Sequence, residues 1–149
     1  MNIKIGKFPN HYFWHGWLYK LFGYSPKQRV KIKIHKWDTW SMDHTLAPII
    51  LPMLVQLKAT NHGYPSGLTE KKWDSIMDEM IWSFEQKCRD DWESDYYEYR
   101  EMGPEESKDP NSLFGLKLVW EDREGQKAHQ KRMTNGFKLF GKYYENLWD

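Results

Sequence analysis

The segment from Arg29 to Leu54 constrains the fold more than any other part of the chain, because three physical patterns follow one another in it without a break. It reads RVKIKIHKWDTWSMDHTLAPIILPML. An alternating run comes first, a dense group of tryptophans and hydrogen-bonding side chains follows, and a nearly all-apolar stretch closes the segment. We therefore expect a polar and aromatic group that is held between two ordered elements.

Residues 29–35 alternate between two kinds of side chain. Val30, Ile32 and Ile34 share one side of this run. The other side carries Arg29, Lys31, Lys33, His35 and, beyond the run, Trp37. A period of two is typical of a half-buried β-strand. We predict a strand over residues 29–35 with a basic face that ends in an aromatic ring.

Apolar periodicity predicts helices elsewhere. They cover residues 41–60, 70–100 and 121–147, and an aromatic segment covers residues 12–22. The first helix is apolar nearly all round, as in an element buried in the middle of a fold, while Pro48 and Pro52 predict a kink or a late start. Thr69 should cap the second helix, whose apolar stripe includes Cys88 as a small buried thiol.

The acidic stretch from residue 90 to 110 contains Gly-Pro and Asp-Pro pairs, which predict a loop or protruding arm. With 149 residues the chain is long enough for one domain with a sizeable core. We predict a mainly α fold with a short β-strand or hairpin (α+β), as a single compact domain over residues 1–149 that forms an oligomer.

Charge is unevenly distributed although the total is only +1. Residues 1–68 contain 9 Lys and Arg against 2 Asp and Glu, and residues 110–149 contain 7 against 5. Residues 69–109 are acidic, with 6 Lys and Arg against 14 Asp and Glu. A protein that binds long nucleic acid is usually basic overall, because it neutralises many phosphates. This pattern favours a small phosphorylated ligand, or complementary pairing of charged surfaces in a homo-oligomer, and no long nucleic acid.

Compartment and reaction class follow from what the sequence lacks. No apolar run reaches the roughly 20 residues that span a bilayer, and the lone Cys88 has no disulfide partner within the chain, so we expect a cytoplasmic protein with no membrane partner. We find no phosphate-binding glycine loop, no serine nucleophile elbow and no zinc motif. The sequence therefore favours a non-catalytic ligand binder that needs no cofactor or metal.

Nine Trp, nine Tyr and seven Phe give a heavy aromatic content, and a nucleobase can stack on such rings beside cations. Large rings also serve cores and protein interfaces, which is the alternative explanation. In the binding hypothesis, cations contact phosphates, tryptophans stack on bases, and carboxylates or hydroxyls read base or ribose edges. The predicted ligand-binding residues are Arg29, Lys31, Lys33, His35, Trp37, Asp38, Thr39, Trp40 and Asp43.

Some of these side chains have other possible roles. Asp38 or Ser41 could cap the first helix, where Asp43 would lie in the first turn. Asp38, Asp43 and His44, with His35, could instead hold a divalent ion and hydrolyse a phosphodiester as a metal-dependent phosphodiesterase. A further alternative is a structural or interaction protein, in which the aromatic residues are interface anchors.

Three blocks carry a resemblance to a known family. They read KIHKWDTWSMDHTLAPIILPMLVQLK, KKWDSIMDEMIWSFEQ and NGFKLFGKYYENLWD, and together they cover about half of the chain. They resemble a widespread family of small tailed-phage proteins, and the chain is similar to the family of anti-CBASS protein four. The resemblance implies a non-enzymatic homotetramer in the cytoplasm of the infected bacterial host. It also implies binding of a cyclic dinucleotide such as 3′,3′-cGAMP, which keeps the CBASS defence from firing.

Overall fold

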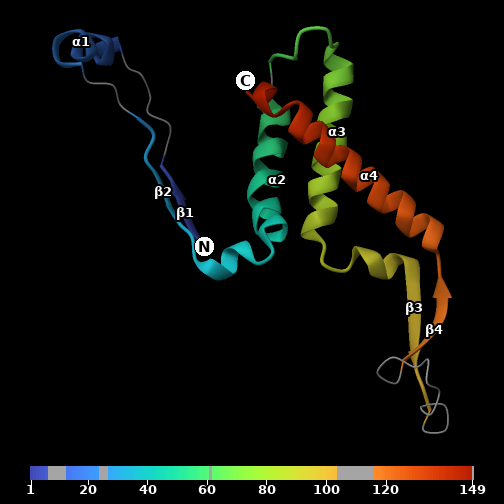
Figure 1. The fold of residues 1–149 in the computed structure, drawn as a ribbon. Coiled ribbons are helices and arrows are strands. Elements are labelled where there is room, and N and C mark those ends of the chain that lie inside the picture. The colour runs from blue at the N-terminus through green and yellow to red at the C-terminus, as the bar shows by residue number, and fades with distance from the viewer. Residues whose placement is uncertain (7–12, 24–26, 61, 104–115, 149) are drawn as a thin grey trace. The chain divides into compact units, whose positions relative to one another are not determined.

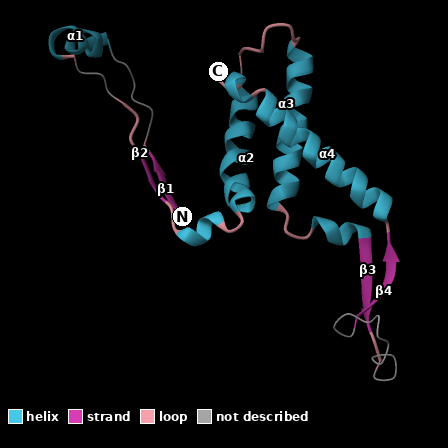
Figure 2. Ribbon diagram, viewed as in Figure 1, coloured by secondary structure: helices cyan, strands magenta, loops and turns pink. Residues whose placement is uncertain are grey.

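Residues 1–6, 13–23, 27–60, 62–103 and 116–148 are described by a computed structural model of the chain (Figure 1). The chain divides into two units, Met1–Met42 and Asp43–Asp149, and each is described by itself. We call them the N-terminal unit and the C-terminal unit. More residues lie in helices than in the two small antiparallel sheets, so the predicted mainly helical α+β class is confirmed (Figure 2). The single domain over residues 1–149 stays a prediction.

The N-terminal unit is built on a hairpin of two strands. Strand β1 (Asn2–Ile5) pairs antiparallel with β2 (Val30–Lys33), and helix α1 (Phe13–Phe22) lies between them in sequence. A short 3₁₀ helix, η1 (Lys36–Thr39), follows β2. The predicted strand is confirmed but shorter than residues 29–35. The aromatic segment is helical over its described residues, and Tyr12 lies outside them.

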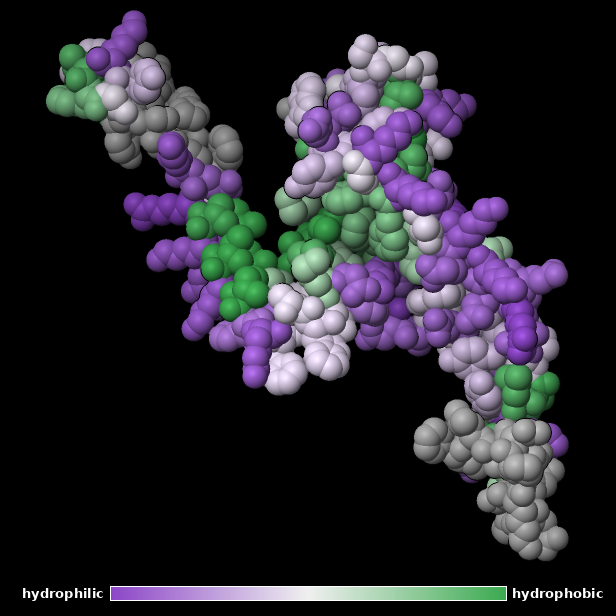
Figure 3. All heavy atoms as spheres, in the orientation of Figure 1, coloured by the Kyte–Doolittle hydropathy of each residue, from purple (hydrophilic) through white to green (hydrophobic). Residues whose placement is uncertain are grey.

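The register of this hairpin separates apolar and basic side chains. Ile3 lies opposite Ile32 and Ile5 opposite Val30, so these four side chains share one face. Lys4 lies opposite Lys31 and Asn2 opposite Lys33, on the other face. The predicted strand was expected to be half-buried, but Val30 and Ile32 are 51% and 60% exposed in the single chain. Figure 3 shows a hydrophobic patch over the β1–β2 hairpin.

The C-terminal unit is mainly helical. Its elements, in chain order, are α2 (Met42–Thr60), α3 (Glu70–Cys88), the 3₁₀ helix η2 (Trp92–Tyr96), β3 (Tyr97–Glu101), β4 (Leu116–Glu121), α4 (Arg123–Lys142) and the 3₁₀ helix η4 (Tyr144–Asn146). Strands β3 and β4 form a second antiparallel hairpin. The predicted helix over residues 121–147 is confirmed as α4, with its last turn as η4.

The core of this unit lies along α3, and the sequence stripe of that helix is confirmed. Thr69 caps α3 by accepting a hydrogen bond from the backbone N–H of Lys72 at 3.3 Å. The buried apolar side chains are Ala47, Leu54, Trp73, Ile76, Met77, Met80, Phe84 and Met133. Ser83 and Gly136 are also buried, where α3 and α4 pack so closely that a Cβ at position 136 would overlap Ser83 Oγ.

The helix predicted over residues 41–60 is confirmed as α2, which starts at Met42 and ends at Thr60. Pro48 and Pro52 lie inside it, so the start is not late, while the kink stays a prediction. The expectation that this helix is buried all round is wrong: Ala47 and Leu54 are buried, whereas Met53 is 61% exposed. The physical reason is that the core it joins covers one side of the helix, while an all-round apolar composition says nothing about which side is covered.

Predictions near the end of α3 also need correction. The helix ends at Cys88 rather than continuing to residue 100, because Arg89 takes an extended backbone as C-cap and η2 and β3 follow. The acidic stretch is thus a 3₁₀ turn leading into a hairpin arm, over its described part up to residue 103. Cys88 is exposed, not buried, since it is the last residue of α3 and no further turn covers it.

Candidate ligand-binding site

The basic face of the β1–β2 hairpin gathers cations from both strands. Lys31 and Lys33 lie on this face, as the sequence predicts, and Lys4 lies directly opposite Lys31. The pairing continues beyond the strands, because the N–H of Gly6 donates to the carbonyl of Arg29 at 2.8 Å. Like charges directly opposite each other weaken a hairpin unless an anion neutralises them. This face is therefore suited to phosphate groups.

Lys4 is a candidate site residue that the sequence analysis missed. The signal was present, because Asn2 to Ile5 alternates polar and apolar residues as β2 does. The run is only four residues long, and such a short alternation becomes informative only when a partner strand is known.

The segment after β2 presents two tryptophans at the surface. Trp37 and Trp40 are 66% and 82% exposed, and their ring centroids lie 6.1 Å apart with the planes tilted by 47°. The ammonium of Lys36 lies 4.9 Å from the Trp37 ring centroid, within cation–π range. The turns of η1 bring these side chains together. The prediction that both rings offer faces to a ligand is compatible with this exposure.

Asp38 is already engaged by its own chain. One carboxylate oxygen accepts from the amino group of Met1 at 2.7 Å, and the other accepts from the backbone N–H of His35 at 2.8 Å. The hydrogen bond from the Met1 amino group, then that from His35, lowers the pKa of Asp38 below its ordinary value. Asp38 thus fixes the start of β1 against η1. To read a base edge it would first have to exchange one of these partners.

Thr39 and His35 also have local roles. The Thr39 hydroxyl donates to the carbonyl of Lys36 at 2.9 Å, which closes the turn of η1. The side chain of His35 is exposed, and His35 is the N-cap residue of η1. Both residues lie on the segment that carries the tryptophans. Of the nine predicted ligand-binding residues, all except Asp43 belong to the N-terminal unit.

Asp43 belongs to the C-terminal unit. It lies in the first turn of α2, as predicted, and its carboxylate is 2.6 Å from the ammonium of Lys87 on α3. The hydrogen bond from Lys87 is the main cause that lowers the pKa of Asp43. Neighbouring His44 faces Asp90, with Nδ1 3.5 Å from the carboxylate. These contacts tie the start of α2 to the end of α3.

The described residues contain no group of three or more His, Cys, Asp and Glu side chains arranged to hold a metal ion. The hypothesis of a metal site at Asp38, Asp43 and His44 required such a group. The structure places Asp38 in one unit and the other two residues in the next, each with a partner of its own. The arrangement offers no support for metal-assisted hydrolysis at these residues.

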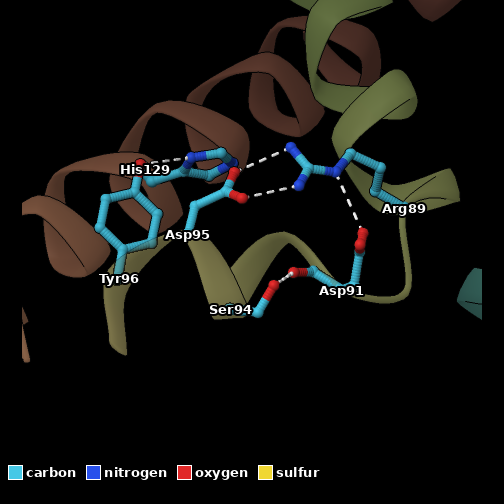
Figure 4. A network of polar contacts seen from close by, with 6 residues as sticks. All are labelled: Arg89, Asp91, Ser94, Asp95, Tyr96 and His129. Atoms are coloured by element: carbon cyan, nitrogen blue, oxygen red, sulfur yellow. Dashed lines mark hydrogen bonds and ion pairs between the residues drawn. The ribbon is translucent and has the colours of Figure 1, made fainter. Parts of the chain in front are cut away.

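A second polar and aromatic cluster surrounds His129 on α4 (Figure 4). Nδ1 of His129 lies 2.9 Å from the hydroxyl of Tyr96 on η2. The imidazole stacks on Trp92 at 4.5 Å with an interplanar angle of 18°, and its centroid lies 4.9 Å from that of Trp82 on α3. Arg132 covers the Trp82 ring at 3.9 Å. We call His129, Tyr96, Trp92 and Trp82 the histidine cluster.

Ion pairs surround the histidine cluster. Arg89 holds Asp95 through two hydrogen bonds of 2.9 Å, which lower the pKa of Asp95, and its Nε donates to Asp91 at 3.1 Å. Arg132 makes a two-point contact with Glu79 on α3. In Figure 4, Asp95 points toward Arg89 while Tyr96 points toward the histidine ring. The contacts fasten η2, and with it the start of β3, to α3 and α4.

Burial decides the chemistry of His129. Removal from water lowers the pKa of His129 below 6.5, although Asp95 partly opposes the shift. Nε2 is buried without a hydrogen-bond partner in the described structure. The lowered pKa favours a neutral ring at neutral pH, and the contacts of that ring with Trp82, Trp92 and Tyr96 make it part of the packing between α3, η2 and α4. Sequence spacing gave no sign of this cluster, since its residues come from three separate elements.

A shallow groove on α4 carries further cations. It has a volume of about 380 Å³ and is lined by Lys127, Gln130, Lys131, Thr134, Asn135 and Lys138. Like-charged lysines four residues apart, such as Lys127 and Lys131, weaken a helix slightly. The groove lacks aromatic rings, so it fits an aromatic ligand less well than the tryptophan segment does.

No family model, no curated protein and no solved structure matches this chain. Among the described residues, no helix combines the length and apolar character needed to cross a membrane. The candidate site therefore rests on geometry and on the sequence resemblance given above.

Proposed function

We propose that this chain binds and sequesters a cyclic dinucleotide such as 3′,3′-cGAMP without cleaving it, and so inhibits the CBASS defence of a phage-infected bacterial host. The proposal includes a homo-oligomer, with a tetramer as implied by the resemblance. It joins that resemblance to the chemistry of the N-terminal unit, where cations and exposed aromatic rings occur in one short segment of chain.

The observation that carries the proposal is the exposed pair of Trp37 and Trp40 beside Lys36. Leaving two tryptophans in water forgoes the burial free energy that large rings normally contribute to a core. Stacking of one base on such a ring is worth roughly 1–3 kcal/mol. Two rings can together hold both bases of a dinucleotide, while the basic face with Lys4, Lys31 and Lys33 attracts the phosphates.

A second candidate function is a phage structural or host-interaction protein. It is favoured by the exposed aliphatic face of the β1–β2 hairpin, because exposed apolar patches rimmed by polar residues mark protein interfaces. In that function Trp37 and Trp40 would be anchors for a protein partner. It predicts no affinity for nucleotides, so binding measurements separate the two functions.

The test is a native gel shift with radiolabelled 3′,3′-cGAMP, followed by boiling and thin-layer chromatography of the released ligand. We expect a shift at micromolar protein and recovery of intact ligand. Trp40→Ala should weaken binding about tenfold, given the stacking free energy above. Trp148→Ala is the matched control, since Trp148 is 68% exposed but belongs to the C-terminal unit.

The outcomes are distinct. Recovery of cleaved ligand would contradict sequestration and indicate that the chain is an enzyme. A shift that Trp40→Ala and Trp148→Ala affect equally would remove the tryptophan segment from the site. No shift at micromolar protein would contradict ligand binding and leave the interaction protein as the better account.

A further inference from the structure

The apolar face of the β1–β2 hairpin lacks cover in the single chain. Ile5, Val30 and Ile32 are 55%, 51% and 60% exposed, and Ile34, just beyond β2, is 51% exposed. A sheet of two strands is at best marginally stable in water unless one face packs against something. The cations of the hairpin lie on its opposite face, so the apolar face can be buried without burying a charge.

Charge indicates what kind of surface covers this face. Residues 1–42 contain 8 Lys and Arg against one Asp, a net charge of +7, which leaves a net charge of −6 for residues 43–149. Opposite net charges attract and orient two surfaces as they approach. A second copy of the chain supplies the complementary acidic surface at the same concentration.

The acidic unit has an apolar hairpin face of its own. In the β3–β4 hairpin, Tyr99 lies opposite Leu118 and Glu101 opposite Leu116, and these side chains share one face. Tyr99, Leu118 and Leu116 are 49%, 42% and 40% exposed. The cations Arg100 and Lys117 oppose each other on the other face. This face therefore presents apolar side chains with a carboxylate and without cations.

We propose that the apolar face of the β1–β2 hairpin binds the β3–β4 hairpin of a second copy of the chain. The two sheets would pack face to face at about 10 Å, with aliphatic side chains between them. The contact joins different surfaces on the two copies, so its repetition forms a closed dimer or ring when the rotation closes and an open filament when it does not. The inference deepens the oligomeric part of the proposed function, and its test contains no nucleotide.

The experiment is sedimentation velocity of the full chain and its variants from about 1 to 100 μM. We expect a concentration-dependent oligomer. Ile32→Gln and Leu118→Gln should each raise the dissociation constant at least tenfold. The controls are charge-conserving variants of their sequence neighbours on the opposite faces, Lys31→Arg and Lys117→Arg, which should change it less than threefold. Far-UV circular dichroism checks that each variant keeps its helices.

Salt gives an independent measurement. Because the two units have opposite net charges, raising NaCl from about 50 to 500 mM should weaken the association. A monomer at 100 μM would overturn the proposal. Association that strengthens with salt would also overturn it, since it indicates contact between two basic hairpins. Loss of the oligomer in Ile32→Gln but not in Leu118→Gln would overturn the assignment of the β3–β4 hairpin as partner. If the chain sediments as a monomer but still shifts 3′,3′-cGAMP in the separate gel assay, this contact is rejected and the proposed ligand binding stands.

Discussion

The two units of this chain use similar residues in opposite ways. The C-terminal unit encloses Trp73, Met77 and Met80 in a core with 2% exposure or less. In the N-terminal unit, none of the residues 1–6, 17–23 and 27–42 is buried. It nevertheless contributes 12 of the 23 large hydrophobic side chains that are exposed among the described residues, from 42 of 149 positions. Hydrophobic content therefore does not distinguish a buried core from an exposed surface in this chain.

The two units differ in what stabilises them. A unit in which residues 1–6, 17–23 and 27–42 include no buried side chain gains little free energy from its own packing, so we expect binding to contribute to the order of its hairpin and its tryptophan segment. A unit with a core holds its shape by itself. Substitutions should consequently affect unfolding in the C-terminal unit and binding in the N-terminal unit.

The largest expected effect is a difference in the free energy of unfolding between alanine variants of a buried and an exposed tryptophan. Trp73→Ala removes a ring that is 2% exposed and contacts Tyr143 edge-on at 5.4 Å, so it should lower the free energy of unfolding by about 3–5 kcal/mol. Trp40→Ala should lower it by less than about 0.5 kcal/mol, because that ring is 82% exposed. Urea unfolding followed by circular dichroism measures both. Equal effects would contradict the contrast between the units.

A smaller effect is expected where α3 and α4 pack. Gly136→Ala places a methyl group against Ser83 and 2.5 Å from the carbonyl oxygen of Glu79, so the helices must move apart at a cost of about 1–3 kcal/mol. Gly141→Ala on the same helix meets no atom within 4 Å and should be neutral or slightly stabilising. The urea midpoints of the two variants should therefore shift in opposite directions or by clearly different amounts.

The smallest effect depends on pH. The folded-state pKa of His129 lies below its ordinary value of 6.5, so the unfolded chain binds more protons in the window below pH 6.5. The contribution of neutral His129 is complete above that value and is lost as the pH falls through the window toward the lowered folded-state pKa. Melting temperatures between about pH 7.5 and 5 should fall in the native chain and fall less in His129→Phe.

A slope that His129→Phe leaves unchanged would show that other groups titrate in this window, and would reject His129 as its cause.

Sequence alone predicted the parts of the fold that depend on local patterns. The stripe through Trp73 and Phe84 and the cap at Thr69 gave α3 its correct start and buried face. Its end was missed because Cys88 continues the period while the backbone leaves the helix at Arg89. Periodicity records which residues can face a core, but a tertiary contact decides whether one is there.

The candidate site shows the same limit. Alternation located Lys31 and Lys33 but not Lys4, whose place opposite Lys31 comes from a pairing across 27 positions of sequence. Asp38 was chosen because a carboxylate can read a base, yet its partners are Met1 and the His35 backbone. The partners Lys4 and Met1 are distant in sequence from Lys31 and Asp38, and such long-range contacts leave no mark in a local pattern.

The glycine at position 136 also acts as a spacer for a distant group. His129 precedes it by seven residues, which is about two helical turns or roughly 10 Å along α4, and Trp82 is next to Ser83 on α3. The separation of the two helices at this small-residue contact therefore sets how far the imidazole reaches between Trp82 and Trp92. A methyl group added at position 136 would push α3 and α4 apart, and this movement would also shift the His129 ring relative to Trp82 and Trp92, which the methyl group does not contact.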